Sequence, residues 1–127
     1  MSHELRGSVA IVGVGLAGLG EAPGRSALEI LAEAAYRAIA DAGLKKADVD
    51  GLLAVTAAHA APTLAVGEYM GIRPKFSDSN YIGGSSFVSH LIPAALALNA
   101  GLCDVALVCY GSNQRSDVGR LKPDGKG

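Results

Sequence analysis

The chain has 127 residues, of which half are apolar and 17 are glycine, and its 11 Lys or Arg nearly balance its 12 Asp or Glu. This length suits one domain with a real core, and the even charge, with no basic patch or acidic tail, argues against nucleic acid or a highly charged partner. The two cysteines and three histidines lack the spacing of metal ligands, so no metal site is expected.

The first expected element is a strand over residues 8–14, where a run rich in β-branched residues indicates burial on both faces of a sheet. No signal peptide precedes it, which predicts a cytoplasmic protein. Gly13, Gly15 and Gly18 then follow in the GxGxxG spacing of a dinucleotide-binding loop. In a dinucleotide-binding domain these glycines lead directly into a helix. Here a segment containing proline and more glycine separates them from the next expected helix. A dinucleotide-binding domain is therefore kept only as a third alternative.

A helix is expected to begin at Ser26, which with Glu29 forms a capping box, and to end at Gly43. A second strand over 51–56, a short helix over 62–71 and a third strand approached over 73–79 follow. His59 lies in the loop after the second strand. Nothing in the sequence pairs with it, so a loop histidine is favoured over a catalytic one.

From Asp78 to Asp104 the intervening residues include no charged side chain, and after the turn at Gly83 and Gly84 they read as a helix that is apolar nearly all round. Such a helix belongs at the centre of a fold, and its apolar run is too short for a membrane span. Pro93 inside it predicts a kink.

The Gly83–Gly84 turn itself has two interpretations. The first helical amides after it carry the positive end of the helix dipole and could form an oxyanion site. A plain strand-to-helix turn needs glycine just as much. Ser86 and His90 are four residues apart on the helix, but no carboxylate stands near them, so a core hydrogen bond is favoured over a serine nucleophile.

The last expected strand covers residues 105–110, and residues 112–127 read as a loop that leads to a missing remainder. Cys103 and Cys109 are too far apart on an extended chain to form a disulfide and are expected to be buried thiols. The β-α-β-α-β-α-β alternation predicts one α/β domain over residues 1–127 with right-handed crossovers and a buried central helix.

Several segments, among them residues 9–15, 28–35, 83–86 and 100–108, resemble in order the amino-terminal part of thiolase-superfamily proteins. The branch they resemble is the lipid-transfer-protein (sterol-carrier-protein-x) type, often called acetyl-CoA acetyltransferase. The resemblance implies a thiolase-like fold, a homodimer, acyl-CoA chemistry of lipid metabolism and no covalently bound cofactor beyond the CoA thioester substrate. Family members are several-fold longer, so a truncated chain is expected, and the 127 residues alone are not expected to be active.

The resemblance also indicates where this chain departs from a thiolase. The family's reactive cysteine lies in a Cys-x-Ser-Gly or Cys-x-Thr-Gly turn, and if Gly84 matches that glycine, Tyr81 stands in the cysteine's place. A phenol is a much poorer nucleophile than a thiolate, which counts against an acyl-enzyme. The resemblance instead implies an aldolase-like lyase with a small OB-fold, zinc-ribbon partner, in which Tyr81 moves a proton or only fills space under the turn. A non-catalytic acyl-CoA-binding or scaffold subunit is the alternative.

Overall fold

Three parallel strands form the sheet at the centre of the structure, a computed structural model that describes residues 5–114. They are β1 (Gly51–Val55), β2 (Phe76–Asp78) and β3 (Ala106–Tyr110), in the order β2-β1-β3. Gly51 at the start of β1 is aligned with Phe76 of β2 and with Ala106 of β3. The strands expected after the first helix are therefore confirmed, each within a few residues of its expected bounds.

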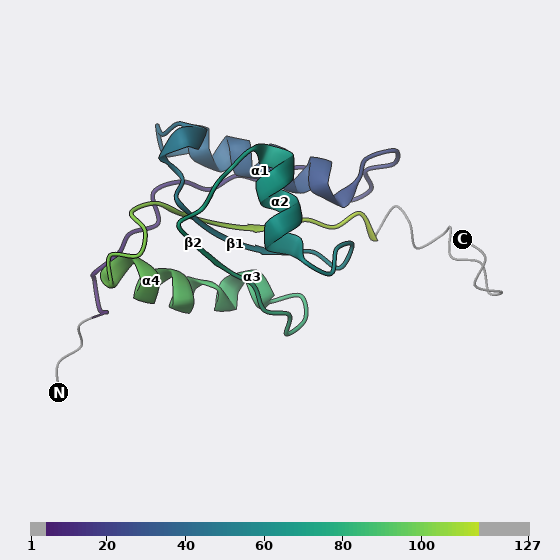
Figure 1. The fold of residues 1–127 in the computed structure, drawn as a ribbon. Helices are drawn as coiled ribbons and strands as arrows, with labels where there is room; N and C mark the ends of the chain where they lie inside the picture. The colour runs from purple at the N-terminus through teal and green to yellow at the C-terminus, as the bar shows by residue number, and fades with distance from the viewer. Residues whose placement is uncertain (1–4, 115–127) are drawn as a thin grey trace.

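Helices cover both faces of the sheet. Figure 1 shows α1 (Ala27–Asp41) and α2 (Pro62–Met70) on one face, and α3 (Ser86–Ser89) with α4 (Leu91–Asn99) on the other. A short 3-10 helix, Lys46–Asp48, joins α1 to β1. The result is the three-layer α/β arrangement that the alternation of strands and helices predicts.

Local signals in the sequence set the ends of α1 and α2. The Oγ of Ser26 accepts a hydrogen bond from the Glu29 N–H at 3.1 Å, as expected of a residue that caps a helix amino terminus. Gly43 and Gly71 follow the two helices with φ of 70° and 73°, a left-handed conformation that glycine adopts without strain.

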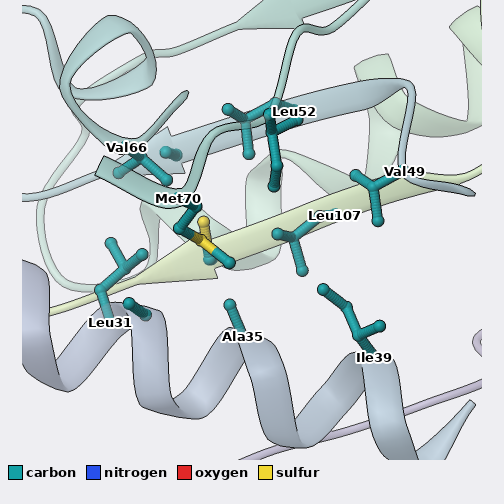
Figure 2. Packing of buried hydrophobic residues seen from close by; sticks show 12 residues of the cluster. Leu31, Ala35, Ile39, Val49, Leu52, Val66, Met70 and Leu107 are labelled. Carbon is teal, nitrogen blue, oxygen red and sulfur yellow. The ribbon is translucent and has the colours of Figure 1, made fainter. Parts of the chain in front are cut away.

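The main core lies between the sheet and the α1–α2 layer (Figure 2). Leu31, Ala35 and Ile39 project from one face of α1 toward Leu107 of β3 and Met70 of α2. Their helical spacing is what places them on one face. All five side chains are buried.

The prediction of a strand over residues 8–14 is wrong. The segment runs extended along α1 outside the sheet, with the Val14 N–H donating to Oδ2 of Asp41 at 2.9 Å. Its side chains face outward, and Ile11 is 73% exposed. The free edges of the sheet are those of β2 and β3, and the segment pairs with neither of them but lies against α1.

The glycines of this segment have a packing role. A Cβ on Gly13 would lie 2.3 Å from the Ala38 carbonyl oxygen, and one on Gly15 would lie 2.2 Å from the Ala34 carbonyl oxygen. Both residues must be glycine for the segment to lie this close to α1. Since α1 begins only at Ala27, the GxGxxG spacing does not form a dinucleotide-binding turn, and that alternative is withdrawn.

The central helix is divided into two. α3 ends at Ser89 and α4 begins at Leu91. Because Pro93 has no N–H, the carbonyl of Ser89 lacks its usual amide partner. The expected kink is therefore present. One side of α4 is buried as predicted, with Ala94 and Ala97 only 5% and 3% exposed. The other side is open to solvent, where three large apolar side chains are between 43% and 65% exposed: Leu91, Ile92 and Leu96.

Candidate active site

A cleft of about 740 Å³ lies at the carboxyl ends of β1 and β2. One wall is the loop from Thr56 to Ala61 with the first turn of α2, and the other is formed by residues 77–81. In open α/β sheets, ligands bind outside the carboxyl ends of the strands, because the loops that follow neighbouring strands converge there. This cleft is therefore the candidate active site.

Hydrogen bonds across the two walls fix their separation. Thr63 Oγ1 at the start of α2 donates to the Asp78 carbonyl oxygen at 3.0 Å. Ser79 Oγ donates to the Ala54 carbonyl oxygen of β1 at 2.7 Å. Because each bond joins segments far apart in the sequence, the cleft is part of the folded framework and does not depend on a single loop.

Tyr81 lies in this cleft, which the resemblance alone could not show. Its side chain is 64% exposed, and its hydroxyl makes no hydrogen bond within residues 5–114. The described residues do not bury the side chain as they would a packing tyrosine, and the role of Tyr81 stays a prediction. The phenol is free to contact a bound molecule.

The chain from Asn80 to Gly83 is held by side chains of α3 and the residue after it. The Ile82 N–H donates to Ser86 Oγ at 2.8 Å, and that hydroxyl donates to the Gly83 carbonyl oxygen at 2.6 Å. The Asn80 N–H donates to Nε2 of His90 at 3.2 Å. Ser86 and His90 are both fully buried and use their side chains to hold the turn. No hydrogen bond joins the two side chains, so they form no nucleophilic pair. Each has a structural role at the turn, but His90 Nδ1 is buried without a partner among the described residues, so the expected core hydrogen bonding is only partly present.

Gly83 has a φ of 102°, which explains the glycine there, while Gly84 faces open space. Neither glycine lines the cleft, whose lining ends at Tyr81. An oxyanion role for Gly83 and Gly84 stays a prediction.

Both cysteines lie away from the cleft. Burial raises the pKa of the Cys109 thiol to about 12. Burial, with the nearby carboxylates of Asp50 and Asp104, raises the pKa of Cys103. Neither thiol is ionised near neutral pH, so neither resembles a reactive cysteine, whose pKa must be lowered. This agrees with the expectation of two buried, unpaired thiols.

His59 is an exposed loop residue, as expected, and it also lines the cleft, which the sequence interpretation did not predict. The imidazole makes no hydrogen bond or ion pair with the described residues, and it is exposed. The order of strands and helices in the sequence could have predicted that His59 lies near Tyr81. His59 and Tyr81 each follow a strand, and parallel neighbouring strands bring the segments after them to one edge of the sheet.

The cleft has little charge. Among residues 5–114, Asp78 is the one acidic residue in its lining, and no Lys or Arg contributes to it. The basic residues Lys46, Arg73 and Lys75 precede β1 or β2, which places them toward the opposite end of the parallel sheet. The cleft therefore suits an uncharged, oxygen-bearing group better than a phosphate.

No protein-family model matches the chain. It is 38% identical over 120 residues to a steroid side-chain-cleaving aldolase of Thermomonospora curvata, covering 90% of this chain and 29% of that protein. It is 37% identical over 115 residues to the 17-hydroxy-3-oxo-4-pregnene-20-carboxyl-CoA lyase of Mycobacterium tuberculosis, covering 90% of this chain and 30% of the lyase. The chain thus spans under a third of the length of these curated relatives.

Two solved structures carry the fold assignment. The Ltp2-ChsH2(DUF35) aldolase superimposes with a TM-score of 0.79 at 35% identity, covering 94% of this chain and 31% of that chain. A monomeric SCP2-thiolase-like protein type 1 of Mycobacterium smegmatis superimposes with a TM-score of 0.59 at 26% identity, covering 76% of this chain and 21% of that chain. The chain has the thiolase-superfamily fold.

In this thiolase-fold chain, the residue at the cleft where the resemblance expects a reactive cysteine is Tyr81. No cysteine lines the cleft, so its lining offers no thiol for an acyl-enzyme. Within residues 5–114 no helix is long and apolar enough to cross a bilayer, and no three His, Cys, Asp or Glu side chains gather as metal ligands would.

Proposed function

We propose that the protein carrying this thiolase-fold segment is a lyase that cleaves a β-hydroxyacyl-CoA by a retro-aldol reaction. The observation that carries the proposal is the cleft, which presents a free phenol at Tyr81 and no thiol. Two relatives named as an aldolase and a carboxyl-CoA lyase support it. Retro-aldol cleavage needs proton transfers and no covalent acyl-enzyme, so such a cleft is sufficient for it.

Tyr81 is proposed to donate a proton in this reaction. Tyrosine is one of the side chains that act as general acids, because its phenol O–H can donate a proton. Cleavage of the bond between Cα and Cβ leaves an enolate of the thioester, which must take up a proton at Cα to become the shorter acyl-CoA. The exposed hydroxyl of Tyr81 is placed to supply that proton or to stabilise the enolate oxygen.

The cleft is proposed to hold the acyl end of the substrate. The phosphates of CoA are usually bound by cations, and the part of the lining within residues 5–114 has neither Lys nor Arg. A hydroxyl-bearing, otherwise apolar acyl group fits a lining that mixes Thr56, Ser79 and Asn80 with Val55 and Leu64. We infer that the CoA moiety lies outside this cleft.

The remaining expectations are also proposals. We place residues 1–127 as the amino-terminal domain of a longer cytoplasmic protein that acts as a homodimer, with a small OB-fold, zinc-ribbon partner. The Ltp2-ChsH2(DUF35) aldolase supports a partner protein, since its name joins two components. No bound cofactor is proposed beyond the CoA thioester substrate.

The test is product analysis with the complete natural polypeptide and any protein that copurifies with it. Incubation with 17-hydroxy-3-oxo-4-pregnene-20-carboxyl-CoA should release a ketone and a shorter acyl-CoA, separable by chromatography. Dependence on free CoA and loss of activity on thiol alkylation would instead indicate thiolysis. CoA-thioester binding without turnover would favour the non-catalytic subunit.

A further inference from the structure

His59 and Tyr81 face one cleft from opposite walls. His59 comes from the loop between β1 and α2, and Tyr81 follows β2. Within the described residues neither side chain has a hydrogen-bond partner. Histidine and tyrosine side chains with a structural role are usually hydrogen-bonded. Two proton-exchanging groups that are free and share a cleft suggest a joint role.

We propose that His59 is the general base of this cleft and takes the proton from the β-hydroxyl group of the substrate. The inference rests on the proposed retro-aldol function and adds to it the group that starts the reaction. Imidazole is suited to the task because its unperturbed pKa lies close to neutrality, where a base is both unprotonated and strong enough to accept a proton.

The loop is built to present the imidazole. Thr56 is buried at its start, and its Oγ1 accepts the Ala58 N–H at 3.3 Å. Pro62 begins α2 at its end. Every other residue between them is alanine, so His59 is the one side chain of the loop with proton chemistry. The Thr63 hydroxyl bond to the Asp78 carbonyl oxygen then fixes this wall against the one that carries Tyr81.

Other nearby groups are poorer candidates. Asp78 is less available as a base because its Oδ1 already accepts the Ser79 N–H at 2.8 Å. His90 is fully buried, and its Nε2 lone pair accepts the Asn80 N–H. Neither Asp78 nor His90 is as free to accept a proton from a bound hydroxyl as His59.

The proposed step balances without any further reactant. The neutral imidazole of His59 takes the β-hydroxyl proton, the C–O bond becomes a carbonyl, and the Cα–Cβ electron pair moves into the thioester as an enolate. The enolate takes a proton from Tyr81 at Cα and becomes the shorter acyl-CoA. The imidazolium then returns a proton to the Tyr81 phenolate, directly or through water, and both residues are restored.

The experiment compares variants of the complete natural polypeptide in the cleavage assay across pH. His59→Gln should lower kcat by about 100-fold or more, with KM changed by less than about threefold, because a general base acts on the rate. The acid limb of the kcat/KM profile, which reports protonation of the base, should disappear. In His59→Ala, added 4-methylimidazole should restore part of the rate. Glu68→Gln, an exposed titratable residue on α2 outside the cleft, is the matched control and should keep the limb.

The outcomes separate the two proposals. A wild-type protein that cleaves no β-hydroxyacyl-CoA overturns the proposed function and the role of His59 with it. An active wild type with an equally active His59→Gln overturns the role of His59 alone. A slow His59→Gln that keeps the acid limb, with no rescue by 4-methylimidazole, also overturns the assignment, because His59 then binds or positions the substrate.

Discussion

The imidazole of His90 accepts a hydrogen bond from the backbone N–H of Asn80, the residue immediately before Tyr81, at 3.2 Å. His90 is fully buried between α3 and α4 on one face of the sheet. Asn80 is in turn held at its side chain, where Oδ1 accepts the Ser89 hydroxyl at 3.1 Å. The position of the candidate catalytic tyrosine therefore depends on a histidine that does not line the cleft.

Replacing His90 should disturb both stability and activity. His90→Leu keeps an apolar side chain of moderate size but leaves the Asn80 N–H without an acceptor, which costs about 1 to 3 kcal/mol. We expect a lower Tm and a lower kcat, because the turn before Tyr81 loses its anchor. His90→Gln restores a side-chain acceptor and should be less harmful by both measures. Equal losses in the two variants would show that shape, and not the hydrogen bond, is what matters at this position.

The carboxylate of Asp50 joins the beginnings of β1 and β3. Its Oδ1 accepts the N–H groups of Asp104 and Val105 at 2.9 Å and 2.8 Å. Asp50→Ala leaves those two amides unpaired, and we expect a destabilisation of roughly 1 to 3 kcal/mol, measured as a fall in Tm. Asp104→Ala is the control, since its exposed carboxylate makes no hydrogen bond to any of residues 5–114. A control that falls as far as Asp50→Ala would assign the effect to lost charge.

Much of the fold was predictable because its signals are local. Ser26 and Glu29 indicate the start of α1. Gly43 and Gly71 indicate where helices end, and Pro93 indicates the break between α3 and α4. Each acts within one turn of the chain, where steric and hydrogen-bonding rules need no knowledge of the rest of the molecule.

The errors arose where the outcome depends on distant partners. Residues 8–14 have strand composition, yet they lie against α1 and pair with neither edge strand, an outcome decided by contacts with residues such as Asp41 far along the chain. The sequence does not link His59 to Tyr81, because the two are 22 positions apart and come to line one cleft through the parallel pairing of β1 and β2. The cleft follows from topology, which residue types alone do not specify.

The buried thiol of Cys109 should make the protein less stable in alkali. Its pKa is raised to about 12 by burial, from an ordinary value of 9.0. Between those pH values the unfolded chain loses the thiol proton while the folded chain keeps it. The stabilising effect is therefore complete below pH 9 and is lost as pH rises toward 12, by at most about 1.4 kcal/mol per pH unit. Tm of the wild type should fall more steeply above pH 9 than that of Cys109→Ala. Parallel curves for the two proteins would contradict the shift.

The exposed side of α4 should drive association when residues 1–127 are produced alone. Ile92 is 65% exposed and Leu96 is 50% exposed, beside other apolar side chains of α3 and α4. Contiguous apolar surface of this kind associates in water. Sedimentation should show oligomers that dissociate on dilution, and Ile92→Lys with Leu96→Glu should shift the population to monomer. A wild-type segment that stays monomeric at high concentration would exclude this surface as a site of association.

The close approach of Gly15 to α1 gives a test of the packing role assigned to the GxGxxG glycines. In Gly15→Ala the new Cβ would lie 2.2 Å from the Ala34 carbonyl oxygen, so the segment must move away from α1 and strain or lose the hydrogen bond from Arg37 to the Leu16 carbonyl oxygen at 2.6 Å. Overpacking of this kind typically costs about 1 to 3 kcal/mol, so we expect a lower Tm. Gly84→Ala, where a Cβ meets no atom within 4 Å, should leave Tm nearly unchanged.

NAD(P) should raise the Tm of neither the wild type nor Gly15→Ala, because the glycines pack against a helix and bind no pyrophosphate. A rise in the wild type that the variant loses would restore the dinucleotide-binding interpretation.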